Sequence, residues 1–393
     1  MTGWSITPVI DWLLHKGRFL ATADALVGEL CQRVRAQGMA LDRVAFFFWT
    51  LHPQYFGVAM FWDGAQVKVL HGTRELLRSE SYLNSPSARI RAGERVIRRR
   101  LERADCPLDW PVLAELKAEG ITDYVIVEVL FSNGSRNSIS LATRRAGGFT
   151  DHDIAEVQGL LHPFALAMEN YTNRDLARTL LETYLGRISG SRVLEGQVHR
   201  GDGDEIDAVI WFSDLRNSTP LAAALGERAF LELLNEYFET TAGAVLEHRG
   251  EVLRFIGDAS LAVFPIGDAA RRAACARAIE AVRAVRVRGR AANERRATAG
   301  LPAFSFGVGL HLGRVLYGNI GTLDRLEFSV IGAAANETAR IESLCKTTGE
   351  DVVLSQAFVG ELGERWPSLG RFDLPGISRP VEVFSLPEGE TRH

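Results

Sequence analysis

Apolar runs alternate with short turn signals in the first part of the chain, as they do in antiparallel sheets. The strand-like runs are Val44–Leu51, Gly57–Trp62, Tyr124–Phe131 and Asn137–Thr143. Asn133-Gly134 separates the last two runs and is a strong hairpin signal. We predict helices over Thr22–Ala36 and Ser87–Glu102. The pattern indicates an α+β domain with an antiparallel sheet over residues 1–150.

A helical segment is expected next, over residues 151–204. Thr150 is placed to cap its start, and Asp151 and Asp153 add negative charge to the first turn. Apolar residues with a three-four spacing form a stripe, at Ile154, Val157, Leu161, Phe164, Met168 and Tyr171. Pro163 lies within the stripe and is expected to kink the helix. Packing on the domain's own sheet and contact with a second copy explain the stripe equally well. The glycine-rich stretch Tyr184–Gly203 leads into the third region.

The third region, residues 205–388, alternates strands with helices. The expected strands are Ala208–Phe212, Glu251–Phe255, Ser260–Phe264, Phe304–His311 and Leu326–Ile331. The expected helices are Leu221–Arg249, Asp268–Arg288 and Ala334–Leu344. This alternation predicts one main sheet with helices packed on it, in an α/β or α+β arrangement.

Composition narrows the class of protein without naming an activity. Hydrophobic residues make up 46% of the chain, charged residues 24%, and the net charge is −4. These values are ordinary for a globular protein and give no reason to expect nucleic acid as a partner. The four cysteines form no CxxC pair and read as reduced thiols. With no long apolar run and no basic leader, we expect a cytoplasmic protein without a membrane span.

Two aspartates stand at positions suited to metal binding. Asp214 ends an apolar strand, and Asp258 follows Gly257 at the tip of a predicted hairpin. Each alone is explained as well by a helix cap or a tight turn. Together, on neighbouring strands, they can hold two Mg²⁺ or Mn²⁺ ions bridged by phosphate oxygens. The loop after Asp214 leads into a helix whose first N–H groups suit a triphosphate, and its candidate binding residues are Leu215, Asn217, Ser218 and Thr219.

A later helix carries Asn336 and Arg340, which are four residues apart and therefore share a face. An arginine beside an amide is a suitable clamp for a phosphoryl group in its transition state. On its own, the pair is explained more simply by a surface arginine that contacts Glu337 or Glu342.

In combination, these pieces resemble the catalytic domain of the class III adenylate and guanylate cyclases. The blocks that carry the resemblance are Phe212–Thr219, Glu251–Ala259, Gly309–Gly313 and Phe328–Gly332, followed by Asn336 and Arg340. The resemblance covers about half of the chain. It implies a ferredoxin-like α+β catalytic domain, with Asp214 and Asp258 as metal ligands. It also implies that Asn336 orients the ribose and that Arg340 stabilises the transition state. Sites in this family lie between two catalytic domains, so it implies a head-to-tail homodimer.

The same resemblance places base recognition at Arg254 and Ser329. Arg254 can donate to N1 of adenine, and Ser329 can accept from its amino group, so we expect ATP as the substrate. Arginine also reaches O6 and N7 of guanine, which keeps guanylate cyclase as an alternative. Gly307 and Pro375 replace basic residues that some members use for the triphosphate tail, and Arg216 or Arg379 are possible substitutes. A catalytically weak nucleotide-binding signalling module is therefore a third reading.

The first region resembles a GAF-type sensor more weakly. The resemblance rests on the strand, hairpin and strand over Tyr124–Thr143, followed by Gly148-Phe149-Thr150-Asp151 at the start of a long helix. It implies a regulatory domain that receives a small-molecule or protein signal, which the sequence does not name. The stretch Tyr184–Gly203 looks like a transducing connector between this domain and the catalytic one.

Overall fold

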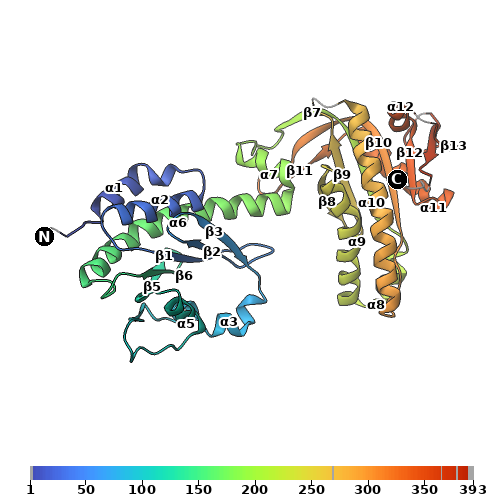
Figure 1. Ribbon diagram of the computed structural model, residues 1–393. Coiled ribbons are helices and arrows are strands. Elements are labelled where there is room, and N and C mark those ends of the chain that lie inside the picture. Colours follow the sequence, from blue (N-terminus) through green and yellow to red (C-terminus); the bar gives the residue numbers. More distant parts are fainter. Residues whose placement is uncertain (1–2, 268–269, 364, 378, 388–393) are drawn as a thin grey trace. The chain divides into compact units, whose positions relative to one another are not determined.

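The computed structural model describes residues 3–267, 270–363, 365–377 and 379–387. The chain divides into two compact units, Met1–Leu180 and Leu181–His393 (Figure 1). Both units combine helices with a largely antiparallel sheet, so the predicted α+β class is confirmed. Across the described residues, we find no helix with the length and apolar character that crossing a membrane requires.

The first unit is built on one six-stranded sheet. Its strands are β1 (Arg43–Trp49), β2 (Gly57–Trp62), β3 (Val67–Gly72), β4 (Val96–Arg99), β5 (Asp123–Leu130) and β6 (Arg136–Thr143). Their order is β3-β2-β1-β6-β5-β4, and every neighbouring pair is antiparallel. The helices are α1 (Thr7–His15), α2 (Ala23–Ala36), α3 (Glu80–Leu83), α4 (Pro86–Arg91), α5 (Pro111–Ala118) and α6 (Asp151–Leu185).

Helices α1, α2 and α6 cover one face of this sheet, and α3 to α5 lie on the other (Figure 1). On the first face, Phe46 and Phe48 of β1 pack against Phe164 of α6. All six residues of the predicted stripe, including Val157 and Met168, are buried in this same core or packed against it, so the stripe does cover the unit's own sheet. Pro163 lies inside α6, which runs unbroken from Asp151 to Leu185.

Local signals at the start of α6 are confirmed, whereas one predicted helix is wrong. Thr150 Oγ1 accepts from the Asp153 N–H at 3.1 Å, and Asp153 Oδ2 accepts from the Thr150 N–H at 2.8 Å. Of the predicted helix Ser87–Glu102, only the first part is helical, within α4. Gly93 then takes a φ of 122°, and Val96–Arg99 becomes the edge strand β4. The reason is tertiary, because Ile97 is buried when β4 pairs with β5.

The second unit holds an eight-stranded sheet. Its strands are β7 (Gly203–Leu215), β8 (Glu251–Ile256), β9 (Ala259–Pro265), β10 (Phe306–Gly321), β11 (Leu326–Ile331), β12 (Val352–Ser355), β13 (Ser368–Phe372) and β14 (Val381–Ser385). The order is β13-β14-β12-β10-β7-β9-β8, with β11 paired to β10. Strands β7 and β10 form the centre and pair continuously from Leu215↔Phe306 to Gly203↔Gly318. Only the β10–β12 pair is parallel among the pairs described.

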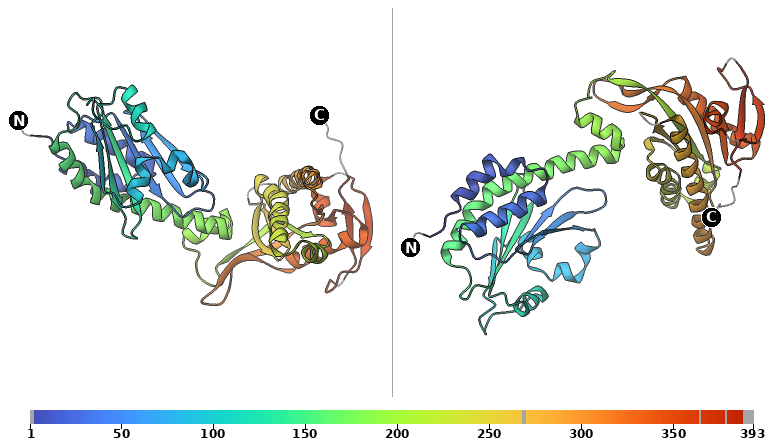
Figure 2. Two further views of the ribbon diagram at one scale, coloured as in Figure 1. Left: turned by 90° about the horizontal axis from the view of Figure 1, so that it is seen from below. Right: turned by 45° about the horizontal axis from the view of Figure 1, so that its top comes forward.

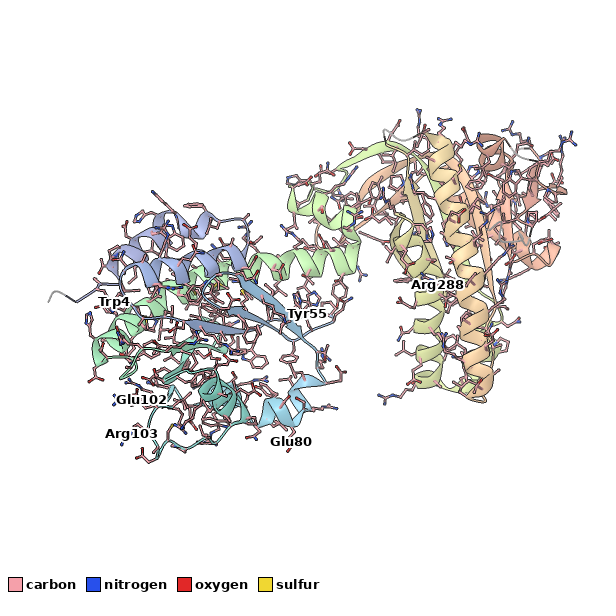
Figure 3. The ribbon with its side chains drawn as sticks, viewed as in Figure 1. Trp4, Tyr55, Glu80, Glu102, Arg103 and Arg288 are labelled. Carbon is pink, nitrogen blue, oxygen red and sulfur yellow. The ribbon has the colours of Figure 1, made fainter. Side chains whose placement is uncertain are left out.

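Helices cover both faces of this sheet. They are α7 (Arg187–Leu194), α8 (Ser218–Leu225), α9 (Glu227–Glu247), α10 (Arg271–Thr298), α11 (Ala333–Thr348) and α12 (Gln356–Leu362). Helices α9 and α10 lie side by side on one face (Figures 1 and 2), and Arg288 of α10 pairs with Glu247 of α9 (Figure 3). The opposite face packs against α11, because the buried Glu342 and Thr338 of that helix sit over Gly309 of β10. The predicted start of the α10 segment, Asp268, lies outside the described residues.

The connecting helix α7 is fixed to the sheet by a buried polar cluster. Glu251, at the start of β8, is 2% exposed and accepts from the backbone N–H and the hydroxyl of Ser189, at 2.8 and 3.0 Å. Tyr317 of β10 donates to the other oxygen of Glu251 at 2.8 Å, and its hydroxyl lies 2.7 Å from Ser189 Oγ. All four polar contacts are inside the unit, so α7 is held by hydrogen bonds to a buried carboxylate.

Candidate active site

Strand pairing brings Asp214 and Asp258 together. Asp214, near the end of β7, pairs with Ala259, the first residue of β9. The backbone N–H of Leu215 donates to the carbonyl of Asp258 at 3.2 Å. Gly257 turns the chain between β8 and β9 with a φ of 64°, which favours glycine. The two aspartates are thus held side by side by backbone hydrogen bonds, as the sequence predicted.

The electrostatics of this pair suit a divalent cation. Burial and the neighbouring Asp258 raise the pKa of the Asp214 carboxyl, while Lys346 and Arg216 oppose the rise. The Lys346 ammonium already approaches Asp214 Oδ2, at 3.4 Å. Mg²⁺ is usually held by one or two carboxylates together with phosphate oxygens, and this donor set fits that description.

The loop after Asp214 offers fewer N–H groups than the sequence suggested. The N–H of Leu215 is used by Asp258, and the N–H of Arg216 donates to the Ser305 carbonyl at 2.9 Å. Asn217 adopts the left-handed conformation, with a φ of 55°, and begins α8 without a side-chain cap. Ser218 and Thr219 form the first turn, where N–H groups have no partner within the helix. A ligand can therefore use the N–H groups from Asn217 onward.

Asn336 and Arg340 lie on α11 and do not face the aspartates of their own chain. Asn336 is exposed. The Arg340 guanidinium lies over the Pro375-Gly376 turn, since a Cβ on Gly376 would be 3.3 Å from both of its terminal nitrogens. Helical residues turn by about 100° each, so Arg340 and the inward-facing Glu342 point about 160° apart. Within one chain, the aspartate pair and the Asn336/Arg340 pair therefore do not form a single site.

The predicted base-reading residues lie on β8 and β11, two strands that contact each other without pairing, and a third residue there was missed in the sequence. The Arg254 guanidinium on β8 pairs with Glu327 of β11 at 2.9 Å. Ser329, two residues further along β11, is fully buried, and its hydroxyl has no hydrogen-bond partner among the described residues. The Nε of Arg254 is also buried and unpartnered. The alternation of β11, in which Phe328 and Val330 enter a core cluster, puts Glu327 and Ser329 on the opposite face.

Comparison with known families identifies the segment that carries these residues. Residues 204–366 match the family described as "Adenylate and Guanylate cyclase catalytic domain". This range contains both aspartates, both base-reading positions and the Asn336/Arg340 pair. The segment belongs to the class III cyclases. We refer to residues 204–366 below as the cyclase domain.

Curated relatives of the cyclase domain include a protein named as an adenylate cyclase. An uncharacterised protein of Mycobacterium tuberculosis (strain ATCC 25618 / H37Rv) is 31% identical over 247 residues, which are 61% of this chain and 43% of that protein. Adenylate cyclase 1 of Rhizobium meliloti (strain 1021) is 27% identical over 182 residues, 44% of this chain and 26% of that protein. The chain therefore spans less than half the length of these relatives.

Two solved structures are similar to the second part of the chain. The guanylyl cyclase Cya2 covers 47% of this chain and 92% of its own, with 30% identity and a TM-score of 0.42. The adenylyl cyclase CyaB from P. aeruginosa covers 48% and 98%, with 21% identity and a TM-score of 0.45.

One buried acid of the cyclase domain also escaped the sequence reading. Glu342 of α11 has its pKa raised to about 7, by burial first and then by Asp214, against the opposing effects of Arg216 and Lys346. Its Oε1 is buried without a hydrogen-bond partner in the described part of the chain. In the sequence, Glu342 could be noticed only because it follows Arg340 by two residues. The fold is needed to show that its side chain turns toward Asp214.

Proposed function

We propose that the protein is an adenylate cyclase, which converts ATP to cyclic AMP and pyrophosphate. The reaction is attack of the ribose 3′-hydroxyl on the α-phosphate, with pyrophosphate as the leaving group. The observation that carries the proposal is the juxtaposition of Asp214 and Asp258 across β7 and β9, within a segment that matches the cyclase family. Two Mg²⁺ or Mn²⁺ ions, when bound by these carboxylates, would lower the pKa of the attacking hydroxyl and neutralise phosphate charge.

The other residues have positioning and charge-stabilising roles in this proposal. The N–H groups of Asn217, Ser218 and Thr219 at the start of α8 hold phosphate oxygens. Asn336 orients the ribose, and Arg340 donates to the α-phosphate as its charge grows in the transition state. Substituting Arg340 with alanine should lower kcat by about 10²-fold with little change in KM, because the contact forms mainly in the transition state.

A second copy of the chain is needed in this proposal. Within one chain, Arg340 lies over Gly376, on the face of α11 roughly opposite the side that meets Asp214. A head-to-tail homodimer supplies the aspartates from one copy and Asn336 with Arg340 from the other. Mixing Asp214→Ala and Arg340→Ala chains should then restore activity, with at most one working site in each heterodimer. If the mixture is as inactive as each variant alone, the shared site is wrong.

Base preference follows from the donors and acceptors at Arg254 and Ser329. The unpartnered Nε–H of Arg254 suits N1 of adenine, which accepts a hydrogen bond, and the buried Ser329 hydroxyl can accept from the adenine amino group. A buried hydroxyl without a partner carries a desolvation cost that a ligand can remove. These two side chains support ATP.

Guanylate cyclase is the second candidate, and Glu327 is the observation that favours it. Its carboxylate lies beside Arg254, at the position where an acceptor could receive the N–H groups of guanine. Arg254 could at the same time donate to O6 and N7. Glu327→Gln should therefore change the ratio of the two activities, whichever base is preferred.

A direct assay separates the candidates. The purified chain is supplied with Mn²⁺ and equal ATP and GTP in one reaction, and the products are separated by mass. Cyclic AMP as the main product supports the proposal, and cyclic GMP as the main product overturns the base assignment. If neither forms at high protein concentration, the nucleotide-binding signalling module replaces both enzymes.

The first unit is proposed to regulate the cyclase domain through a small-molecule or protein signal. A cavity of about 450 Å³ in this unit supports a small molecule. Aromatic side chains line it, namely Phe47, Trp49, Phe56, Phe61 and Tyr82. The buried Tyr82 hydroxyl has no partner in the described residues. Cyclase activity of the full chain should differ from that of Leu181–His393 alone, and equal activities at equal dimer content would contradict regulation.

A further inference from the structure

Gly307 leaves a space beside Asp214 that another residue fills. The two residues pair directly across β10 and β7, so they share one face of the sheet. A Cβ on Gly307 would lie 2.3 Å from a terminal nitrogen of Arg216 and 2.3 Å from Glu342 Oε1. Real Cβ atoms do not come this close to other heavy atoms. The Arg216 guanidinium therefore occupies the place where a side chain at position 307 would begin.

This guanidinium is buried without being satisfied. The Arg216 side chain is 12% exposed, and neither of its terminal nitrogens has a hydrogen-bond partner in the described residues. Glu342 is its nearest acid, at 3.7 Å, which is too long for a hydrogen bond. Removing charged donors from water without replacing their hydrogen bonds is strongly unfavourable. The arrangement is therefore incomplete as it stands.

A purely structural ion pair would look different, and the chain contains two for comparison. Arg286 holds Asp351 with two hydrogen bonds, at 2.6 and 2.8 Å. Arg98 holds the buried Asp123 at 2.7 Å. Arg216 makes no such contact although Glu342 is close, so its donors remain available beside the two aspartates.

We propose that Arg216 binds the phosphate chain of the nucleotide, in place of the basic side chain that some members of the family carry near the position of Gly307. The inference rests on the proposed function, because it takes the ligand to be a nucleoside triphosphate. The guanidinium N–H groups of Arg216 lie on the same side of the sheet as Asp214. The planar guanidinium group can donate two parallel hydrogen bonds to phosphate oxygens. Glu342 keeps the guanidinium in the glycine-lined space until the phosphates arrive.

Binding measurements test this assignment without depending on turnover. Arg216→Ala should weaken binding of inorganic tripolyphosphate in the presence of Mn²⁺ by about 10- to 100-fold, the usual effect of losing charge-assisted hydrogen bonds. Binding of adenosine 5′-monophosphate should change much less, because it lacks the phosphate tail. Calorimetry measures both affinities on the full chain. Equal tripolyphosphate affinity in Arg216→Ala and the unaltered chain overturns the proposal.

A positional swap makes the test specific to charge in this space. Arg216→Ala combined with Gly307→Arg should recover most of the lost affinity, because the guanidinium returns from the neighbouring strand. Arg216→Ala combined with Gly307→Gln supplies a neutral side chain and should not recover it. Equal recovery by both double variants would show that only filling of the space matters, and would overturn the phosphate role.

Further variants distinguish a loss of phosphate binding from misfolding and from failure of the proposed cyclase activity. Arg277→Ala removes a half-buried arginine that contacts Pro265, at the other end of β9 from Asp258, and should leave tripolyphosphate affinity unchanged. If Arg216→Ala shows no cooperative thermal unfolding transition, it is not folded, and Arg216→Lys is used in its place. A loss of tripolyphosphate affinity is again expected. Failure to cyclise any nucleotide, with Arg216-dependent tripolyphosphate binding intact, would remove the proposed function and leave this assignment standing.

Discussion

Two buried polar sites, one in each unit, differ in how their groups are satisfied. In the first unit, Asp123 is fully buried and receives the Arg98 guanidinium at 2.7 Å and the Phe149 N–H at 2.9 Å. In the cyclase domain, Glu342 Oε1, Ser329 Oγ and the terminal nitrogens of Arg216 are buried without partners in the described residues. Native proteins satisfy nearly all buried polar groups, so the exceptions need an explanation. The satisfied Arg98–Asp123 pair is structural, whereas these three unsatisfied groups of the cyclase domain cluster at the residues that we propose meet a ligand.

Among the tests of this contrast, the largest expected effect is the loss of cyclase activity when Asp214 or Asp258 is replaced. Asp214→Asn and Asp258→Asn should each lower kcat by about 10³-fold or more, since metal ions supply several kcal/mol of charge stabilisation. Stability should not fall with Asp214→Asn, because burial and Asp258 already raise the pKa of this carboxyl and disfavour its charge. Cyclase assays and thermal unfolding of the same samples measure both. Near-normal turnover in either variant would contradict the metal assignment.

The matching substitution in the first unit should have the reverse effect. Asp123→Asn removes the charge that holds Arg98, and breaking such a buried pair should cost about 3 kcal/mol of unfolding free energy. The specific activity per folded molecule at saturating substrate should stay the same. Urea unfolding and activity of the folded fraction check this. A lost activity without lost stability would place Asp123 in a signalling role and end the contrast.

Ser329→Ala should sharpen the comparison with a smaller change. Its hydroxyl has no partner, so removing it should leave the free energy of unfolding unchanged or raise it by up to about 1 kcal/mol. A change in the ratio of kcat/KM for ATP and GTP should accompany this, because the hydroxyl is expected to meet the base. Ser213→Ala is a matched control, since Ser213 Oγ lies 2.8 Å from Ser260 Oγ and its loss should destabilise the domain. Equal destabilisation by both variants would contradict the distinction.

The smallest expected effect is on pH dependence. Burial lowers the pKa of His311, while Glu337 opposes the shift, and its Nδ1 lies 2.9 Å from Ser355 Oγ. As the pH falls below about 6.5, the unfolded chain takes up this proton more readily than the folded one, so stability decreases. His311→Gln should make stability less dependent on pH between 5 and 7. Urea unfolding at both values measures the slope. The same slope for His311→Gln and the unaltered chain would contradict the assignment.

Local patterns gave the elements of the cyclase domain more reliably than its contacts. The β8–β9 hairpin and helix α11 could be predicted because their signals are local. These signals are the apolar spacing within each element and Gly257 at the hairpin turn. The helix predicted over Ser87–Glu102 failed where pairing with β5 outweighed local preference. The two aspartates could be found from spacing, but the Arg254–Glu327 pair joins residues 73 positions apart. Contacts over such distances depend on the fold, and no period in the sequence encodes them.

The docking of α7 has a practical consequence for anyone who builds chimeric enzymes from this chain. A cut at Ile206, the first apolar residue of the catalytic region, would remove Ser189 and leave the buried carboxylate of Glu251 with only Tyr317 as a hydrogen-bond partner. Glu251 starts β8, the strand that also carries Arg254 and leads to Asp258. Such a truncated domain would be weakened around Arg254 and Asp258 by the choice of junction alone. Fusions to a foreign sensor should therefore be joined upstream of Gly186, so that α7 travels with the catalytic sheet.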